Sequence, residues 1–162
     1  MANKIYRAIE TAITFQDSAG DVAITLQNLG FGAGRLSARY DQGAGSKSRL
    51  WNWRAVVQFE TAAAVEERVE IWLFESDGTY ADGAVGTADA ALTSDQRKNG
   101  KLLGVVVVDT TGTATNIIAS GVCVISTRYF SIGVWNASAA DNLENTANAC
   151  KIIMTPVPDE IQ

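Results

Sequence analysis

Residues 51–59 read WNWRAVVQF, and this stretch decides the fold class because apolar residues occupy every second position. Successive side chains of a β-strand point to opposite faces, so a period of two sorts them into two rows. One row holds Trp51, Trp53, Ala55, Val57 and Phe59, and the other holds Asn52, Arg54, Gln58 and Glu60. The pattern predicts a strand with one face in a core and the other in water.

A second decisive stretch is RVEIWLFES at residues 68–76. Val69, Ile71 and Leu73 share one face, while Trp72 and Phe74 lie on the opposite face. A strand that is apolar on both faces is covered on both, either by its own fold or by a neighbouring molecule. The residues assigned to the core are Trp51, Trp53, Val57, Phe59, Val69, Ile71 and Leu73.

The same alternation recurs along the chain, interrupted by turns rich in Gly, Asn, Asp and Ser. About nine strands follow one another in this way, which is the spacing of a β-sandwich or a barrel. We predict an all-β fold, a two-sheet antiparallel β-sandwich of jelly-roll type. At most one short helix is expected, near residues 88–97, where Asp89 and Thr93 are suitable caps.

The 162 residues predict a single β-sandwich domain over residues 1–155, with residues 1–10 as an extended arm. Both prolines, Pro156 and Pro158, lie within the last seven residues. Proline fixes its own backbone angle and favours an extended residue before it. Residues 156–162 are therefore predicted to form an extended C-terminal tail.

Charge and hydropathy exclude two classes of partner. The net charge is -5 and no run of Lys or Arg is present, so binding to nucleic acid is not expected. The longest apolar run, LLGVVVV at 102–108, is far shorter than a membrane span. The first ten residues lack the apolar segment of a secretory signal, so we expect synthesis in a cytosol, with Cys123 and Cys150 buried and reduced.

The sequence contains no set of residues that could act together in catalysis. Histidine, the commonest general base and metal ligand, is absent. Carboxylates near the start of residues 68–76 match a solvated strand end better than a glycosidase pair, and the Asp-Gly pairs of residues 77–100 are turn signals rather than a calcium loop. The glycines of GFGAG at 30–34 lack the Lys and helix of a phosphate loop. We therefore predict no enzymatic activity, no cofactor and no metal site.

The four tryptophans allow two interpretations. They could form a platform on which sugar rings stack, or they could pack in a core or a subunit interface. Trp51 and Trp53 continue into an apolar row, which favours packing. Trp72 and Trp135 lie opposite the best apolar row of their strands, so they are the expected surface pair.

The C-terminal stretch RYFSIGVWNASAADNLENTANACKIIMTPVPDEIQ, residues 128–162, resembles the ends of small structural proteins of tailed bacteriophages. Residues 1–29 have a similar character. The resemblance implies a virion component of the decoration, or cement, type. Such a protein would be made in the host cytoplasm, would sit on the capsid surface as a homodimer or homotrimer, and would bridge neighbouring major capsid proteins.

In this interpretation, seven residues are expected at interfaces with the capsid protein or a sister subunit. They are Trp72, Phe74, Tyr129, Trp135, Pro156, Pro158 and Ile161. The alternative is a glycan-binding jelly-roll module of a phage fibre, a tail or the capsid surface, with Trp72 and Trp135 as stacking rings. A tail or baseplate subunit is the second alternative.

Overall fold

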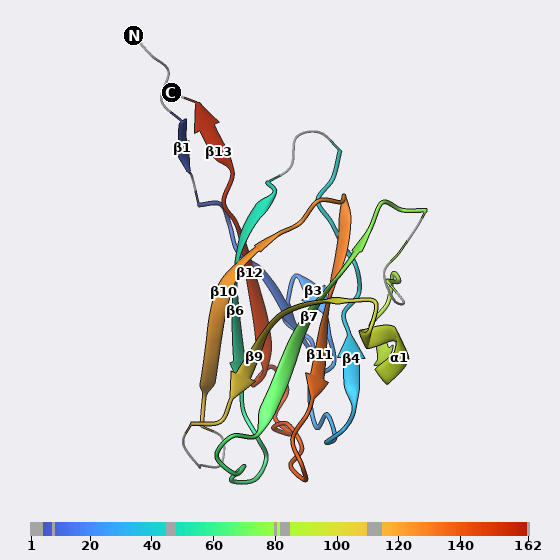
Figure 1. The fold of residues 1–162 in the computed structure, drawn as a ribbon, viewed down its shortest axis with the longest axis vertical. Coiled ribbons are helices and arrows are strands. Elements are labelled where there is room, and N and C mark those ends of the chain that lie inside the picture. The colour runs from blue at the N-terminus through green and yellow to red at the C-terminus, as the bar shows by residue number, and fades with distance from the viewer. Residues whose placement is uncertain are drawn as a thin grey trace.

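The computed structural model describes residues 5–7, 9–44, 48–79, 81, 85–109 and 115–161, which form two β-sheets packed face to face and a projecting two-stranded ribbon (Figure 1). The first strands are β1 (Ile5–Arg7), β2 (Ile13–Gln16), β3 (Val22–Ala23), β4 (Gly34–Leu36), β5 (Tyr40–Asp41), β6 (Leu50–Val57) and β7 (Arg68–Ser76). They are followed by β8 (Ala90–Leu92), α1 (Ser94–Arg97), β9 (Lys101–Val107), β10 (Ile117–Val124), β11 (Tyr129–Asn136), β12 (Lys151–Pro156) and β13 (Asp159–Ile161).

The two sheets are interleaved in sequence. One sheet has five strands in the order β10-β6-β12-β2-β3, and the other has six, β8-β4-β11-β7-β9 with β5 paired to β11. The chain crosses between the sheets after β3, β5, β6, β9, β10 and β11. This exchange of strands between two packed sheets is the jelly-roll arrangement.

The predicted all-β sandwich is confirmed, with three differences of detail. The strands are more numerous than expected because several are fragments of two or three residues. The pair β2 and β3 is parallel, whereas the other strand pairs in the described residues are antiparallel. The helix α1 lies inside the predicted range and is capped by Thr93, whose side chain accepts a hydrogen bond from the Gln96 N–H. Asp89 instead pairs with Arg35.

The core lies between the sheets, where the two predicted apolar rows meet. Trp51 and Trp53 of β6 expose only 2% and 4% of their surface, and Val57 and Phe59 are equally buried. Val69, Ile71 and Leu73 of β7 face them with no exposed surface. The Trp51 ring packs edge-on against Phe130 of β11 at a centroid distance of 5.3 Å. Its indole N–H donates to the Ser48 carbonyl at 3.0 Å, so this large ring is buried with its polar atom satisfied.

The Trp53 ring fills the side of the sandwich where the edge strands β9 and β10 approach each other. Two glycines make room for it. A Cβ atom placed on Gly104 of β9 or on Gly121 of β10 would lie 2.7 Å from the ring. No side chain other than hydrogen fits at either position without a shift of the indole. The ring is therefore held between two backbones and is closed off from solvent.

The outer face of the six-stranded sheet is covered by the chain itself. Phe74 projects there, opposite to the core, and packs with Leu36 and Leu92 in a second apolar cluster. The covering segment runs from Leu92, the last residue of the edge strand β8, through α1 to Gly100, and α1 lies on the right of Figure 1. Phe74 has no exposed surface, so its predicted place at an interface is wrong. The second apolar face of residues 68–76 is covered mainly by the protein's own fold.

The two ends of the chain form one ribbon. β1 pairs with β13 in antiparallel fashion, with Ile5 opposite Ile161, and the pair projects beyond the sandwich (Figure 1). The predicted arm and tail are thus partners of each other. The extended tail begins two residues later than predicted. Pro156 is the last residue of β12, and the Val157 N–H still donates a hydrogen bond to the Leu50 carbonyl. Residues 1–4 and 8 of the predicted arm lie outside the described residues.

Within the described ranges, no helix combines the length and the hydropathy needed to cross a membrane.

We expect Gly121→Val to lower the free energy of unfolding by about 1–3 kcal/mol, because the added side chain overpacks the Trp53 indole. Urea titration followed by tryptophan fluorescence would measure the loss. The neighbouring Ser120→Val, on the exposed side of the same strand, is the matched control and should stay within about 0.5 kcal/mol of the wild type. Equal stability of the two variants would show that the indole is not confined as described.

Candidate functional site

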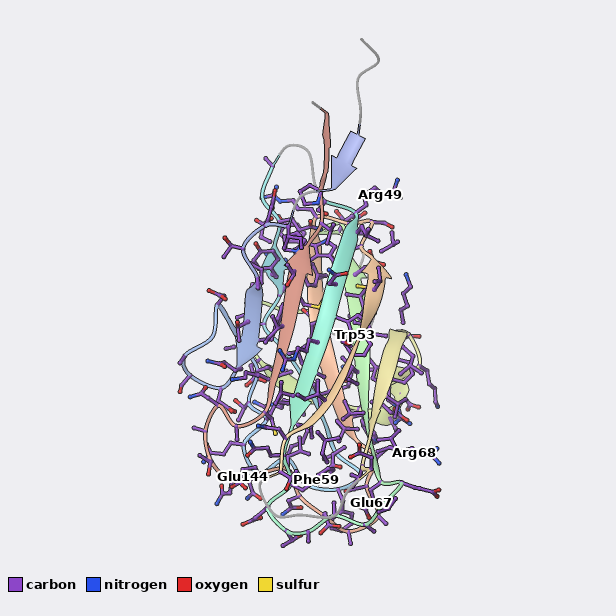
Figure 2. All side chains as sticks on the ribbon, turned by 90° about the vertical axis from the view of Figure 1, so that its left-hand side faces the viewer. Arg49, Trp53, Phe59, Glu67, Arg68 and Glu144 are labelled. Carbon is purple, nitrogen blue, oxygen red and sulfur yellow. The ribbon has the colours of Figure 1, made fainter. Side chains whose placement is uncertain are left out.

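The outer face of the five-stranded sheet is a large surface that the described part of the chain leaves open. Figure 2 turns this side of the molecule toward the reader, with β12, β6 and β10 in front. The strand register sets the outward side chains in rows across β10, β6 and β12. These rows are Val122–Asn52–Thr155, Ser120–Arg54–Ile153 and Ile118–Val56–Lys151. Directly opposite residues of antiparallel strands lie close enough for their side chains to touch, so the rows form one continuous surface, called the outer face below.

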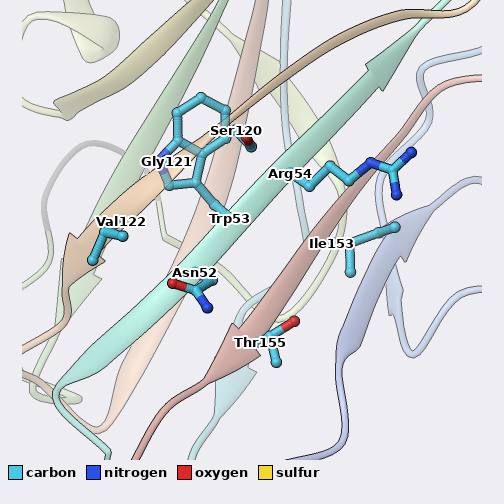
Figure 3. Close-up of a pocket in the computed structure, with 8 residues that line it drawn as sticks. All are labelled: Asn52, Trp53, Arg54, Ser120, Gly121, Val122, Ile153 and Thr155. Atoms are coloured by element: carbon cyan, nitrogen blue, oxygen red, sulfur yellow. The ribbon is translucent and has the colours of Figure 1, made fainter. Parts of the chain in front are cut away.

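A shallow depression of about 340 Å³ lies in the middle of the outer face. Asn52 and Arg54 of β6 stand between Ser120 and Val122 on one side and Ile153 and Thr155 on the other (Figure 3). Trp53 contributes to the wall from behind β10, beside Gly121, and does not offer a ring face to solvent. The depression therefore presents amide, guanidinium and hydroxyl groups set among aliphatic side chains.

The β10 side of the outer face is unusually apolar for an exposed strand. Ile118, Val122 and Val124 are 51%, 62% and 43% exposed. β10 contains no charged residue and no proline over its eight residues. Contiguous exposed aliphatic side chains are uncommon on monomeric proteins and mark surfaces that bind a partner.

The charge of the outer face is positive although the protein as a whole is acidic. None of the nine residues in the three rows is a carboxylate. The ion pairs seen among the described residues are Arg35–Asp89, Arg97–Glu70, Lys98–Asp95 and Arg128–Asp41. Arg54 and Lys151 belong to none of these pairs, so both cations remain available to a partner.

The outer face offers binding groups rather than reactive ones. Its rows contain no carboxylate, thiol or imidazole that could act as a base or nucleophile. The two cysteines are free and buried, and burial raises the pKa of each thiol to about 11, which keeps them protonated and unreactive at neutral pH. Among the described residues, no group of three or more Cys, Asp or Glu side chains could hold a metal ion.

The predicted surface pair, Trp72 and Trp135, lies on the other sheet and is covered in part by α1. The Arg97 guanidinium stacks over the Trp135 ring at 4.2 Å and lies 5.8 Å from the Trp72 centroid. Glu70 fixes the arrangement, because its Oε2 accepts the Trp72 indole N–H at 3.0 Å and the Arg97 Nη1 at 2.9 Å. Both rings are half-buried, and they do not form an open stacking platform.

The other residues predicted at interfaces are dispersed. Tyr129 is half-buried, with the Arg39 and Arg128 guanidinium groups 4.4 and 4.9 Å from its ring centroid. Pro156 is buried at the end of β12, so it is not an exposed tail residue. Pro158 is half-buried, and the side chain of Ile161 lies outside the described part of the structure.

The outer face was not predicted as a site, although its signal is present in the sequence. Asn52 and Arg54 form the polar row opposite the two core tryptophans. Residues 117–124 carry apolar side chains at both odd and even positions, the same two-sided pattern as residues 68–76. The pattern identifies a second apolar face but does not tell which of two such strands is covered by the chain itself.

A second charged feature is the acidic end of the sandwich, formed by the loops before β7 and before β12. Glu67 and Glu144 are labelled at this end in Figure 2. The Ala139 N–H donates to Glu67 Oε1 at 3.2 Å and so ties the two loops together. Burial raises the pKa of the Glu67 carboxyl, the Ala139 N–H lowers it, and the neighbouring Asp141 carboxylate raises it further.

Comparison with known proteins identifies no family. No family model matches the sequence, and no curated protein matches it.

Three solved structures are similar to this chain at low identity. The C-terminal CBM6 of LamC, a marine laminarinase from Zobellia galactanivorans, is 12% identical with a TM-score of 0.45, over 90% of this chain and 99% of that chain. An exo-beta-1,3-galactanase from Phanerochaete chrysosporium, solved with galactose, is 11% identical with a TM-score of 0.32, over 95% of this chain and 29% of that chain. The N-terminal cellulose-binding domain of Cellulomonas fimi beta-1,4-glucanase C is 9% identical with a TM-score of 0.29, over 93% and 88%. At these identities and TM-scores the similarity assigns neither a family nor a ligand to this chain.

We expect Glu67→Gln to stabilise the protein at neutral pH. The pKa of Glu67 is raised in the folded state, so the folded protein holds this proton more tightly than the unfolded chain does. The stability that protonation supplies is present at low pH and is lost as the pH rises above about 4.5, the ordinary value. Glutamine stays neutral and keeps an acceptor for Ala139, so it avoids this loss.

Thermal melts across this pH range would measure the difference between Glu67→Gln and the wild type, which should shrink toward acid pH. Glu60→Gln, an exposed residue of the same loop, is the control and should show no such trend. A Glu67→Gln protein that is less stable than the wild type at neutral pH would contradict the assignment.

Proposed function

We propose that the protein is a non-enzymatic assembly subunit that binds another protein through the outer face of its five-stranded sheet. The observation that carries this proposal is the exposed aliphatic set Ile118, Val122 and Val124 beside an unpaired Arg54, with no carboxylate in the rows. Exposed apolar area on a rigid sheet is stabilised when a partner removes it from water.

The composition of the outer face is that of a protein interface. The central parts of such interfaces are depleted in Asp, Glu and Lys and enriched in Arg and large apolar residues. Arginine is also frequent among the few residues that dominate binding energy, because its planar guanidinium can form several hydrogen bonds while its stem packs on apolar surface. Arg54 lies in the middle row, between Ser120 and Ile153, where it could act in this way.

The placement of the aromatic rings argues in the same direction. A sugar site of the stacking type requires a ring face open to solvent. Trp51 and Trp53 are in the core, and Arg97 lies over Trp135 on the opposite side of the molecule. The outer face thus offers aliphatic contact and hydrogen bonds, which suit a protein surface better than a sugar ring.

The resemblance of residues 128–162 to phage structural proteins suggests a phage particle as the assembly to which the subunit belongs. In this proposal the subunit decorates a capsid and bridges neighbouring major capsid proteins, alone or as a small homo-oligomer. A module of standard interface size, about 1,600 Å² in total, adds substantial stability when it is repeated over a shell. No catalysis is needed for such a role.

Val122→Lys tests the proposal at the most exposed of the aliphatic residues. Lysine replaces the aliphatic contact by an ammonium group that must lose water among apolar side chains and beside the like-charged Arg54, so association should weaken about tenfold or more, a change of about 1.4 kcal/mol. Light scattering over a concentration series, and co-sedimentation with expanded capsids of the parent phage, would measure it. Leu102→Lys changes an exposed aliphatic residue on the other sheet. It is the matched control and should leave both self-association and capsid binding unchanged.

A wild-type protein that neither self-associates nor binds capsids would refute the assembly role. Wild-type binding by Val122→Lys would instead show that the outer face is not the contact.

A second candidate function is glycan recognition in the depression. The specific observation in its favour is the set of hydrogen-bonding side chains around the cavity of about 340 Å³, namely Asn52, Arg54, Ser120 and Thr155. Such groups match sugar hydroxyls and could fix the orientation of a saccharide on the sheet.

For this candidate we expect Asn52→Ala to abolish retention on an immobilised polysaccharide while the melting temperature and the oligomeric state remain those of the wild type. Affinity electrophoresis against laminarin, cellulose and galactan gels would measure retention. Trp72→Ala, on the opposite sheet, is the control and should leave retention unchanged. Free migration of the wild type in every gel would remove this candidate.

A further inference from the structure

We propose that the partner covering the outer face is the acidic end of a second copy of this chain, so that subunits associate head to tail. This inference rests on the proposed assembly function and deepens it by naming the occupant of the outer face. Two surfaces of the molecule carry it, the outer face and the acidic end. They are opposite in charge, and both expose apolar side chains.

The acidic end is built from four loop segments, residues 24–33, 58–67, 108–109 and 137–150. Hydrogen bonds hold three of them together: the Glu60 N–H donates to the Asn142 carbonyl at 3.1 Å, and the Asn28 N–H donates to the Glu144 carbonyl at 3.2 Å. Residues 108–109 join them through the Glu66 N–H, which donates to the Val108 carbonyl at 2.8 Å. The end is therefore a single defined surface.

All charged side chains of these loops are negative. The loops contain Glu60, Glu66, Glu67, Asp109, Asp141 and Glu144, and they contain no Lys or Arg. Arg68 and Lys151 are the first residues of the strands that leave this end, β7 and β12. The loops thus present the carboxylates that the outer face lacks.

Apolar side chains accompany the charge on both surfaces. Phe31 and Val65, in two of the acidic loops, are 56% and 54% exposed. Val122 and Ile118 are the corresponding exposed apolar residues of the outer face, and they are 62% and 51% exposed. A contact between the two surfaces removes apolar area from water on both sides and sets carboxylates opposite Arg54, which favours the correct partner and register.

A symmetric contact between two outer faces is less favourable. In a two-fold interface the same patch meets itself, so a contact centred on the middle row would bring Arg54 against its own copy with no carboxylate in the rows to separate the charges. Head-to-tail contact avoids this repulsion. Such an interface is heterologous, and it closes into a ring or continues as a chain, depending on the rotation between subunits.

Charge reversal tests the inference with the full-length protein itself. Arg54→Glu places a carboxylate at the centre of the outer face, and the double variant Glu60→Arg/Glu66→Arg places two cations among the carboxylates of the acidic end. Each should weaken self-association about tenfold or more, because like charges then face each other. An equimolar mixture of the two should restore association to within about threefold of the wild type, since the carboxylate introduced in one variant then meets the cations introduced in the other.

Sedimentation velocity at low salt would measure association, and circular dichroism would verify that each variant is folded. Arg49→Glu makes the same charge change at an exposed residue of the opposite end of the sandwich and should associate like the wild type (Figure 2). Rescue in the mixture cannot arise from misfolded chains, so it separates lost contact from lost structure.

Three results would overturn the inference: association of both reversed proteins at the wild-type level, a mixture that remains dissociated, or a wild type that is monomeric at every concentration. Loss of association in Val122→Lys combined with no effect of the reversals would refute only the acidic occupant and leave the assembly function standing. A monomeric wild type that binds capsids, or that is retained on polysaccharide gels, would assign the outer face to those partners instead.

Discussion

The confinement of the Trp53 indole between the backbones of Gly104 and Gly121 is the constraint on which much of the molecule depends. The ring occupies the side of the sandwich where the edge strands of the two sheets converge, and its neighbour Trp51 packs against Phe130 further along the same row. Together the two rings fix how β6 packs against the six-stranded sheet. Because side chains alternate along a strand, fixing the inward row also fixes the outward row, Asn52 and Arg54.

The two sheets differ in how their outward faces, the faces away from the core, are covered. On the six-stranded sheet, β8 and α1 cover Phe74, and Arg97 is clamped between Glu70 and the Trp135 ring. On the five-stranded sheet, Ile118 and Val122 remain more than half exposed. The same sandwich therefore has one outward face that the chain itself covers and one that the described part of the chain leaves exposed. This asymmetry is the reason for placing function on the outer face.

The four tryptophans are informative because none of them presents an open ring face on the outer face. Four indoles in 162 residues suggest sugar stacking, yet two are enclosed in the core and two lie half-buried near Arg97. The groups left on the outer face are aliphatic, hydroxyl, amide and guanidinium. Such a surface can hold a protein or a polar ligand, and its rows contain no carboxylate, thiol or imidazole.

The sequence by itself determined the sheet class, the two core rows and the cap of the short helix. These features depend on local rules: alternation with a period of two, turn residues between strands, and Thr93 three residues before Gln96. It also showed that residues 68–76 are apolar on both faces, which left open what covers the second one.

Only the tertiary structure decided which apolar faces are covered. Periodicity is the same for Phe74, which ends in a buried cluster, and for Val122, which remains exposed. The difference arises because a segment distant in sequence, through β8 and α1, folds over one sheet and not over the other. The pairing of Arg54 with Ser120 and Ile153 is likewise a matter of long-range register, and so is the gathering of acidic loops at one end. Neither contact is encoded in any single stretch of the chain, because each joins strands or loops that meet only when the two sheets pack.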